Sequence, residues 1–112
     1  MPHHGLTLQQ LQTIAGILRP YADRITLVGL FGSRALGTWR ETSDIDMVLY
    51  GPVSEADVDR LYTLFMESHL PVKVDVVAYD LVEYPQLKQH IDRVMQPLFT
   101  QEDLQAAPDQ GG

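Results

Sequence analysis

Three short runs of branched and aromatic apolar residues constrain this chain more than any other feature, because each has the length and composition of a buried strand. The runs are RITLVGLF at 24–31, SDIDMVLY at 43–50 and VKVDVVAY at 72–79. Gly32 directly follows the first run, and Gly51-Pro52 follows the second, so both runs end where a strand would end. The sequence therefore predicts a sheet of about three strands.

The segments that precede and separate these runs have the apolar spacing of helices. Thr7 to Gln10 and Ser54 to Asp57 have the form of capping boxes, and Pro20 is expected to end the first helix. Apolar residues recur at steps of three and four behind both boxes, at Leu8, Leu11, Ala15 and Leu18, and at Val58, Leu61, Tyr62 and Phe65. The fold class predicted is α+β, an α/β layer in which a small mixed sheet is flanked by roughly three main helices.

The C-terminal part is expected to contain one more helix and then a tail. Pro85 is a favourable first helical residue, and the inner face of this helix is expected to carry Leu87, Ile91, Val94 and Leu98. The segment QEDLQAAPDQGG at 101–112 has no apolar period, so we expect a disordered tail there. Because 112 residues suffice for one core, residues 1–100 are expected to form a single domain.

Charge and composition exclude several classes of function. With 15 acidic and 8 basic residues the net charge is −7, so no direct binding of nucleic acid is expected. The chain has no cysteine, which excludes disulfides and thiolate metal sites. No secretory signal and no apolar run of membrane-spanning length is recognisable, so the expected location is cytoplasmic. An acidic chain of this kind suits a nucleotide held through divalent cations, or a basic partner protein.

Three aspartates are the strongest indication of chemistry. Asp44 and Asp46 are two residues apart on an expected strand, so their carboxylates project to the same face. Carboxylate oxygens on a rigid strand suit Mg²⁺, which is usually held by one or two carboxylates together with substrate phosphates. Asp75 lies among valines in the third run and joins the pair if that strand lies beside the second. Two metal ions could then be held for a displacement at phosphorus.

The glycine and serine that end the first run supply a site for phosphate. Gly32 lets backbone N–H groups approach phosphate oxygens, Ser33 adds a hydroxyl, and Arg34 could neutralise phosphate charge. Each feature alone has an ordinary explanation: a Gly-Ser turn, an Asp-x-Asp strand edge, or an Asp75 paired with an arginine. Their conjunction favours a site for nucleotide and metal. This is not a P-loop, because no lysine and second glycine follow at the required spacing.

The four histidines and the one tryptophan are not expected to bind metal or nucleotide. His3 and His4 lie near the N-terminus and are expected to be solvated, whereas His69 and His90 are isolated in the sequence. A histidine metal site is therefore not expected. For Trp39 we expect a packing role.

The segment from Gly32 to Asp46, with Gly-Ser, ten residues and Asp-x-Asp, resembles the signature of the DNA polymerase β-like nucleotidyltransferase superfamily. The short chain is most similar to its minimal prokaryotic members. The resemblance implies the polymerase β-like fold over residues 8–98. It implies that Asp44, Asp46 and Asp75 are catalytic and bind two Mg²⁺ ions, and that Gly32 and Ser33 hold the phosphates of the nucleotide. The chain departs from the family at Leu36, where a basic residue is common; Arg34 or Arg40 would have to compensate.

Many members of this family resemble antitoxins encoded beside a HEPN ribonuclease toxin. The resemblance implies Mg²⁺-dependent transfer of AMP from ATP to a tyrosine hydroxyl of that toxin, within a hetero-oligomer. Two alternatives stay open: an antitoxin that acts by binding alone, and a nucleotidyltransferase for a small molecule such as an aminoglycoside. A core this short leaves little surface for recognising a drug, so a protein acceptor is expected.

Overall fold

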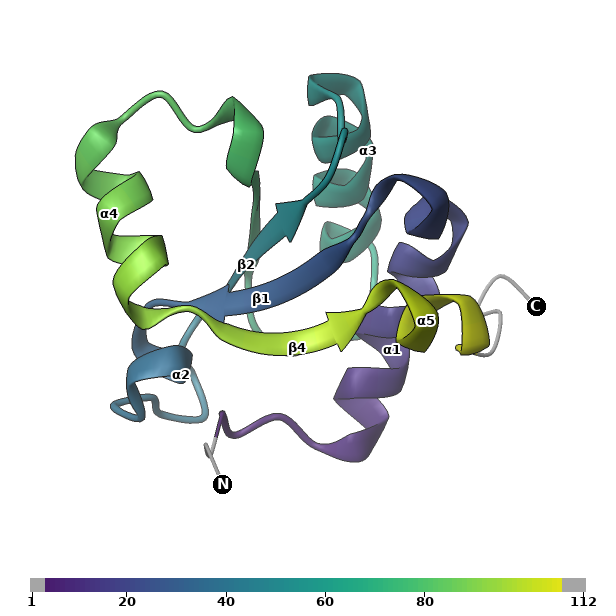
Figure 1. Ribbon diagram of the computed structural model, residues 1–112. Coiled ribbons are helices and arrows are strands. Elements are labelled where there is room, and N and C mark those ends of the chain that lie inside the picture. Colours follow the sequence, from purple (N-terminus) through teal and green to yellow (C-terminus); the bar gives the residue numbers. More distant parts are fainter. Residues whose placement is uncertain (1–3, 108–112) are drawn as a thin grey trace.

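Four strands form one mixed sheet in a computed structural model that describes residues 4–107 (Figure 1). They are β1 (Leu27–Phe31), β2 (Ile45–Tyr50), β3 (Val74–Ala78) and β4 (Gln96–Thr100), in the spatial order β3-β2-β1-β4. β1 is antiparallel to both of its neighbours, whereas β2 and β3 are parallel. The predicted mixed sheet is confirmed, with one strand more than predicted.

Both predicted capping boxes are present and begin the two longest helices, α1 (Leu8–Leu18) and α3 (Glu55–Met66). Thr7 Oγ1 accepts from the Gln10 amide at 3.1 Å, while the Gln10 side chain accepts from the Thr7 amide at 2.9 Å. After α1 the chain continues through Pro20 as a 3-10 helix, η1 (Arg19–Arg24). Three other helices and one further 3-10 turn complete the described residues: α2 (Ser33–Leu36), η2 (Tyr79–Leu81), α4 (Pro85–Val94) and α5 (Gln101–Ala106).

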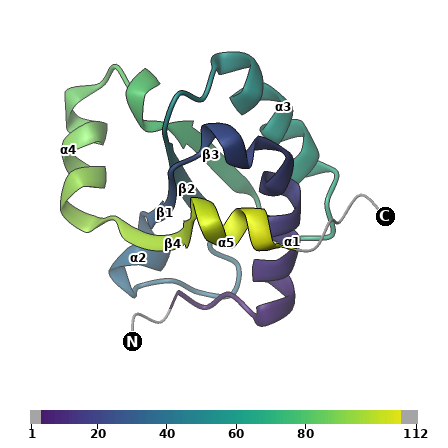
Figure 2. The ribbon, with the colours of Figure 1, turned by 45° about the vertical axis from the view of Figure 1, so that its right-hand side comes forward.

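The helices cover the two faces of the sheet unequally. α1, α3 and α5 lie on one face and α4 lies on the other, as Figures 1 and 2 show. Alternation along β2 explains the division, because Ile45, Met47 and Leu49 belong to the large core under α1, α3 and α5. Val48 instead packs with Ile91 of α4 in a small second core. The face that α4 covers is therefore the one that carries Asp46.

The last predicted helix is too long. α4 begins at Pro85 as expected but ends at Val94, and Leu98 lies in β4 rather than on the inner face of the helix. Pro97 of β4 has no N–H to donate, which restricts it to an edge strand, and β4 is at the edge of the sheet beside β1. β4 forms because its backbone hydrogen-bonds to the edge of β1 that β2 leaves open. The local spacing of apolar residues does not reveal this long-range pairing.

The expected disordered tail at 101–112 is wrong for its first half. Thr100 and Asp103 form a third capping box, and α5 follows it. Leu104 is fully buried in the large core, and the Gln101 side chain donates to the Ala22 carbonyl at 2.7 Å. Residues 108–112 lie outside the described residues.

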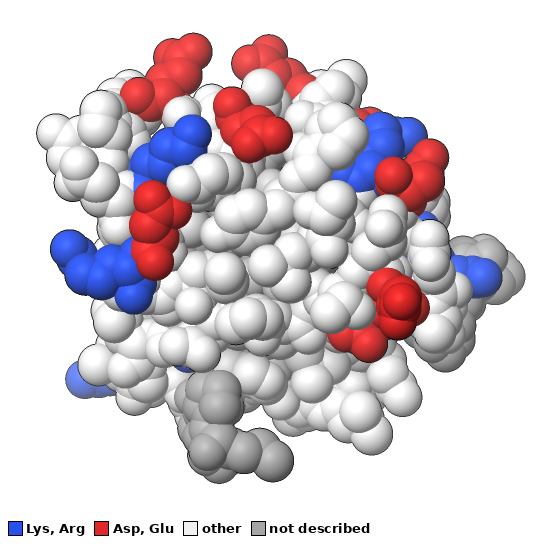
Figure 3. Space-filling view, in the orientation of Figure 1, with Lys and Arg blue, Asp and Glu red and all other residues white. Residues whose placement is uncertain are grey.

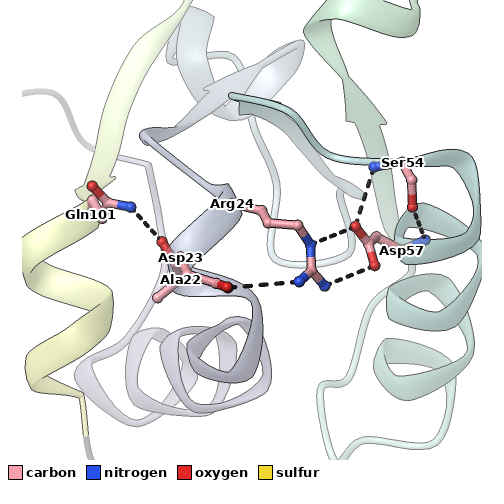
Figure 4. A network of polar contacts seen from close by, with 6 residues as sticks. All are labelled: Ala22, Asp23, Arg24, Ser54, Asp57 and Gln101. Carbon is pink, nitrogen blue, oxygen red and sulfur yellow. Dashed lines mark hydrogen bonds and ion pairs between the residues drawn. The ribbon is translucent and has the colours of Figure 1, made fainter.

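A polar network joins η1 to the start of α3 (Figure 4). Arg24 donates from Nε and Nη2 to the two carboxylate oxygens of Asp57, each at 2.9 Å. Asp57 also accepts from the Ser54 amide, completing the capping box, and Asp23 lies 3.7 Å from the same guanidinium.

No helix between residues 4 and 107 has the length and apolar content to cross a membrane.

Candidate functional site

The pairing of β1 with β2 brings the Gly-Ser pair and the first two aspartates together. Phe31 is the register partner of Asp46, so the chain leaves the sheet at Gly32 and re-enters it at Ile45. The ten-residue spacer is the connection between the strands, and α2 is its first turn. The fixed spacing in the sequence is thus the length of chain that returns the aspartates to the end of β1.

Two features of the structure require glycine at position 32. Its φ of +72° and ψ of −154° lie in a region that is essentially reserved for glycine. A Cβ at this position would also collide with Oδ2 of Asp46. The bare backbone at Gly32 therefore leaves room for the carboxylate, and Ser33 begins α2 directly beside it.

Asp46 and Asp75 stand opposite each other as register partners in the parallel pair of β2 and β3. Partial burial raises the pKa of Asp46, and the neighbouring charges of Asp75 and Asp44 raise it further. Asp44 lies just before β2 and is exposed. The structure therefore places Asp46 beside Asp75, and Asp44 is close enough for its charge to act on the Asp46 carboxyl.

Lys73 also lies beside the aspartates, although it was not among the residues predicted for the site. Its Nζ lies 3.5 Å from Oδ1 of Asp75, and the charge of Asp75 raises the pKa of Lys73. The signal in the sequence is the spacing of two residues in VKVDVVAY, which puts both side chains on one face of an extended chain.

The chemistry of the donor set fits a hard divalent cation. Asp46, Asp75 and the nearby Asp44 all offer carboxylate oxygens, which are the ligands that Mg²⁺ prefers. Repulsion from Asp75 and Asp44 contributes to the raised pKa of Asp46, and a bound cation would relieve this repulsion. As they stand, no three histidine or carboxylate side chains within residues 4–107 are gathered closely enough to hold a metal ion. Two adjacent carboxylates nevertheless fit Mg²⁺, which is usually held by one or two carboxylates with phosphate oxygens and water as its other ligands.

Arg34 is where the structure departs from the sequence-based site. Its side chain is 4% exposed and donates to the carbonyls of His4 at 2.8 Å and Ser43 at 3.0 Å. Its guanidinium carbon lies 5.7 Å from the ring centroid of Trp39, which packs as expected, and burial lowers the pKa of Arg34. A guanidinium held in this way links the β1–β2 connection to the N-terminal segment, which favours a structural role over the predicted binding of phosphate.

His90 lies near the aspartates although it is isolated in the sequence. It comes from α4, and its ring packs edge to face on Phe31, with 6.3 Å between centroids. Phe31 is the register partner of Asp46, and the charge of His90 opposes the other influences on the pKa of that carboxyl. Only the packing of α4 on the sheet, a contact between distant segments, reveals this neighbour.

Comparison with known proteins identifies the domain family and the fold. The family model described as "Nucleotidyltransferase domain" matches residues 11–107. A chain of the solved structure "the toxin-antitoxin with AMP-PNP" is 24% identical, with a TM-score of 0.66 over 85% of this chain and 80% of that one. A chain of "the toxin-antitoxin MntA-HepT" is 26% identical, with a TM-score of 0.58 over 85% and 76%. No curated protein matches. The similarity to these solved structures confirms the predicted α+β fold of the polymerase β-like nucleotidyltransferases.

Proposed function

Because this chain belongs to the nucleotidyltransferase domain family, we propose that it is an antitoxin that transfers AMP from ATP to a hydroxyl group of its toxin. The observation that carries the proposal is the pair of facing carboxylates, Asp46 and Asp75, at the backbone opening left by Gly32. Carboxylates beside a glycine turn are what a site for a metal-bound triphosphate needs. The two toxin-antitoxin structures, one of them with AMP-PNP, support the type of partner and of nucleotide.

The residues of the chain would divide the work as follows. Asp44, Asp46 and Asp75 would hold two Mg²⁺ ions, which would neutralise charge on the phosphates. The backbone at Gly32 and the hydroxyl of Ser33 bind the β- and γ-phosphates. A carboxylate oxygen of Asp75 takes the proton from the acceptor hydroxyl. The acceptor oxygen then forms a bond to the α-phosphorus, the bond to the pyrophosphate oxygen breaks, and pyrophosphate leaves.

The acceptor proposed is a tyrosine of a HEPN ribonuclease toxin, held in a hetero-oligomer with this chain. An acceptor that is a protein rather than a nucleic acid agrees with the net charge of −7, which disfavours contact with phosphate backbones. The family resemblance carried by Gly32, Ser33 and the three aspartates supports the tyrosine.

The experiment is the intact mass of the toxin after co-expression with this chain. We expect an AMP-sized increment with the wild-type chain, and none with Asp44→Asn or Asp46→Asn. Glu102→Gln, which neutralises an exposed carboxylate on α5, is the matched control and should leave the increment in place. Absence of the increment with the wild-type chain, ATP and Mg²⁺ would refute the proposal.

The same variants separate the alternatives. If Asp44→Asn neutralises the toxin as well as the wild type does, the chain acts by contact alone. If the purified chain releases pyrophosphate from ATP only when an aminoglycoside is added, the acceptor is a small molecule.

A further inference from the structure

A groove of about 440 Å³ runs along the outer edge of β3, between α3 and the segment that leads to α4. Within residues 4–107, β3 pairs with β2 alone, so its other edge carries no strand. In Figure 1, α3 and η2 stand on either side of this end of the sheet. An open strand edge offers backbone N–H and C=O groups to a second chain.

The lining of the groove is apolar at its base and acidic at its rim. β3 contributes Val76, Val77 and Ala78, and the lining also includes Leu81, which is 41% exposed. Tyr84 is 74% exposed at one end. Glu55, Asp59 and Glu83 supply three carboxylates, and the lining includes no lysine or arginine. Figure 3 shows acidic side chains gathered over the segment between β3 and α4.

We propose that this groove binds an extended segment of the acceptor protein in which basic side chains flank an apolar one. The inference rests on the proposed function in one respect, that the bound protein is the one that receives the nucleotidyl group. The strand edge provides backbone hydrogen bonds, the apolar base takes a side chain, and the three carboxylates attract lysine or arginine. A second copy of this chain fits poorly, because two acidic rims would face each other.

The groove also lies in the right place to deliver an acceptor. Asp75 directly precedes Val76 on β3, so the groove begins one residue beyond the aspartate proposed to take the proton. A strand rises about 3.3 Å per residue, which puts Ala78 roughly 10 Å along the strand from Asp75. A segment anchored at Ala78 therefore presents an acceptor hydroxyl to Asp75 from about three residues away. The groove thus selects the sequence around the modified residue.

The test measures the affinity of the purified toxin for this chain by biolayer interferometry, beside the intact-mass assay. Tyr84→Ala is expected to weaken binding about tenfold, because it removes an aromatic contact. Glu83→Lys is expected to slow association several-fold and to reduce its dependence on salt. Leu8→Ala and Glu102→Lys make the same kinds of change at exposed positions of α1 and α5 and should bind as the wild type does. Thermal melting of each variant checks that it is folded.

The outcomes separate this inference from the proposed function. If folded Tyr84→Ala and Glu83→Lys bind the toxin like the wild type, the groove does not hold the acceptor, whatever the mass assay shows. If they bind weakly and the wild type adds no AMP, the groove is a docking surface and the transfer is refuted. If the chain alone forms a dimer that Tyr84→Ala dissociates, the occupant is a second copy and the inference is overturned.

Discussion

The carboxylate of Asp46 occupies the space that a side chain at Gly32 would need. Gly32 directly follows β1, Asp46 lies on the antiparallel neighbour β2, and the pairing of Phe31 with Asp46 fixes their approach. The glycine of the motif therefore does more than allow a turn. It determines where one of the three site carboxylates can stand.

Gly32→Ala should consequently impair transfer more than it impairs folding. The added methyl group meets Asp46 and displaces its carboxylate, and a misplacement of about 1 Å can lower a rate about 100-fold. The positive φ adds a loss of stability of at least about 1 kcal/mol. Toxin modification by intact mass and the free energy of unfolding in urea measure the two effects.

Gly37→Ala is the matched control, because Gly37 also has a positive φ, of +82°, but a Cβ there would meet nothing within 4 Å. It should lose less stability than Gly32→Ala, because its backbone lies in the left-handed helical region that other residues can enter, and it should keep its rate of transfer. Equal losses of rate in the two variants would show that backbone strain, and not the contact with Asp46, is responsible.

Arg34→Met should destabilise the chain without a specific effect on nucleotide. It removes the donor to the carbonyls of His4 and Ser43 in a buried place, at an expected loss of about 1–3 kcal/mol. Arg40→Met, at an exposed position of the same connection, should change stability little. Urea denaturation and the KM for ATP are the measurements. A KM raised more than about tenfold with unchanged stability would restore Arg34 to the phosphate site.

The ion pair of Arg24 with Asp57 should make the protein less stable in acid. The hydrogen bond from Arg24 holds the pKa of Asp57 below its usual range. A depressed carboxyl pKa gives stability that is complete above the unfolded value, near 3.9, and is lost as the pH falls through the folded value. Unfolding in urea from about pH 6 to pH 2 should therefore show a decline below about pH 4, which Asp57→Asn reduces.

Asp59→Asn makes the same change at an exposed position two residues further along α3. It should leave the acid decline as in the wild type. If Asp57→Asn also leaves it unchanged, other groups cause the decline and the pair contributes little, as surface ion pairs often do.

Local signals in the sequence were sufficient for much of the fold and for the carboxylates. The capping boxes at Thr7 and Ser54, the start of α4 at Pro85 and the three apolar runs are each determined by neighbouring residues. The contact of Asp75 with Asp46 needs only that two predicted strands be adjacent, and they are. Local signals thus locate the three aspartates on or beside their strands, whereas the meeting of Asp46 with Asp75 depends on the long-range pairing of β2 with β3.

What sequence reasoning missed depends on contacts between distant segments. Leu98 continues a helical period from Leu87, yet β4 forms because it pairs with β1, some seventy residues earlier in the chain. Arg34 has a sequence context typical of a phosphate ligand, but the carbonyl of His4, thirty residues away, takes its guanidinium. Neither partner can be identified from the residues around it.

Leu104→Ala tests the part of the chain that was expected to be disordered. Leu104 is fully buried against the large core, so its truncation should lower the free energy of unfolding by about 2–5 kcal/mol and the melting temperature by at least about 8 °C. Gln105→Ala, at the next and exposed position of α5, should change neither by a measurable amount. Circular dichroism during heating, with urea denaturation, gives both values. If Leu104→Ala melts like the wild type, α5 does not pack on the core in solution, and residues 101–107 behave as the tail that their composition suggests.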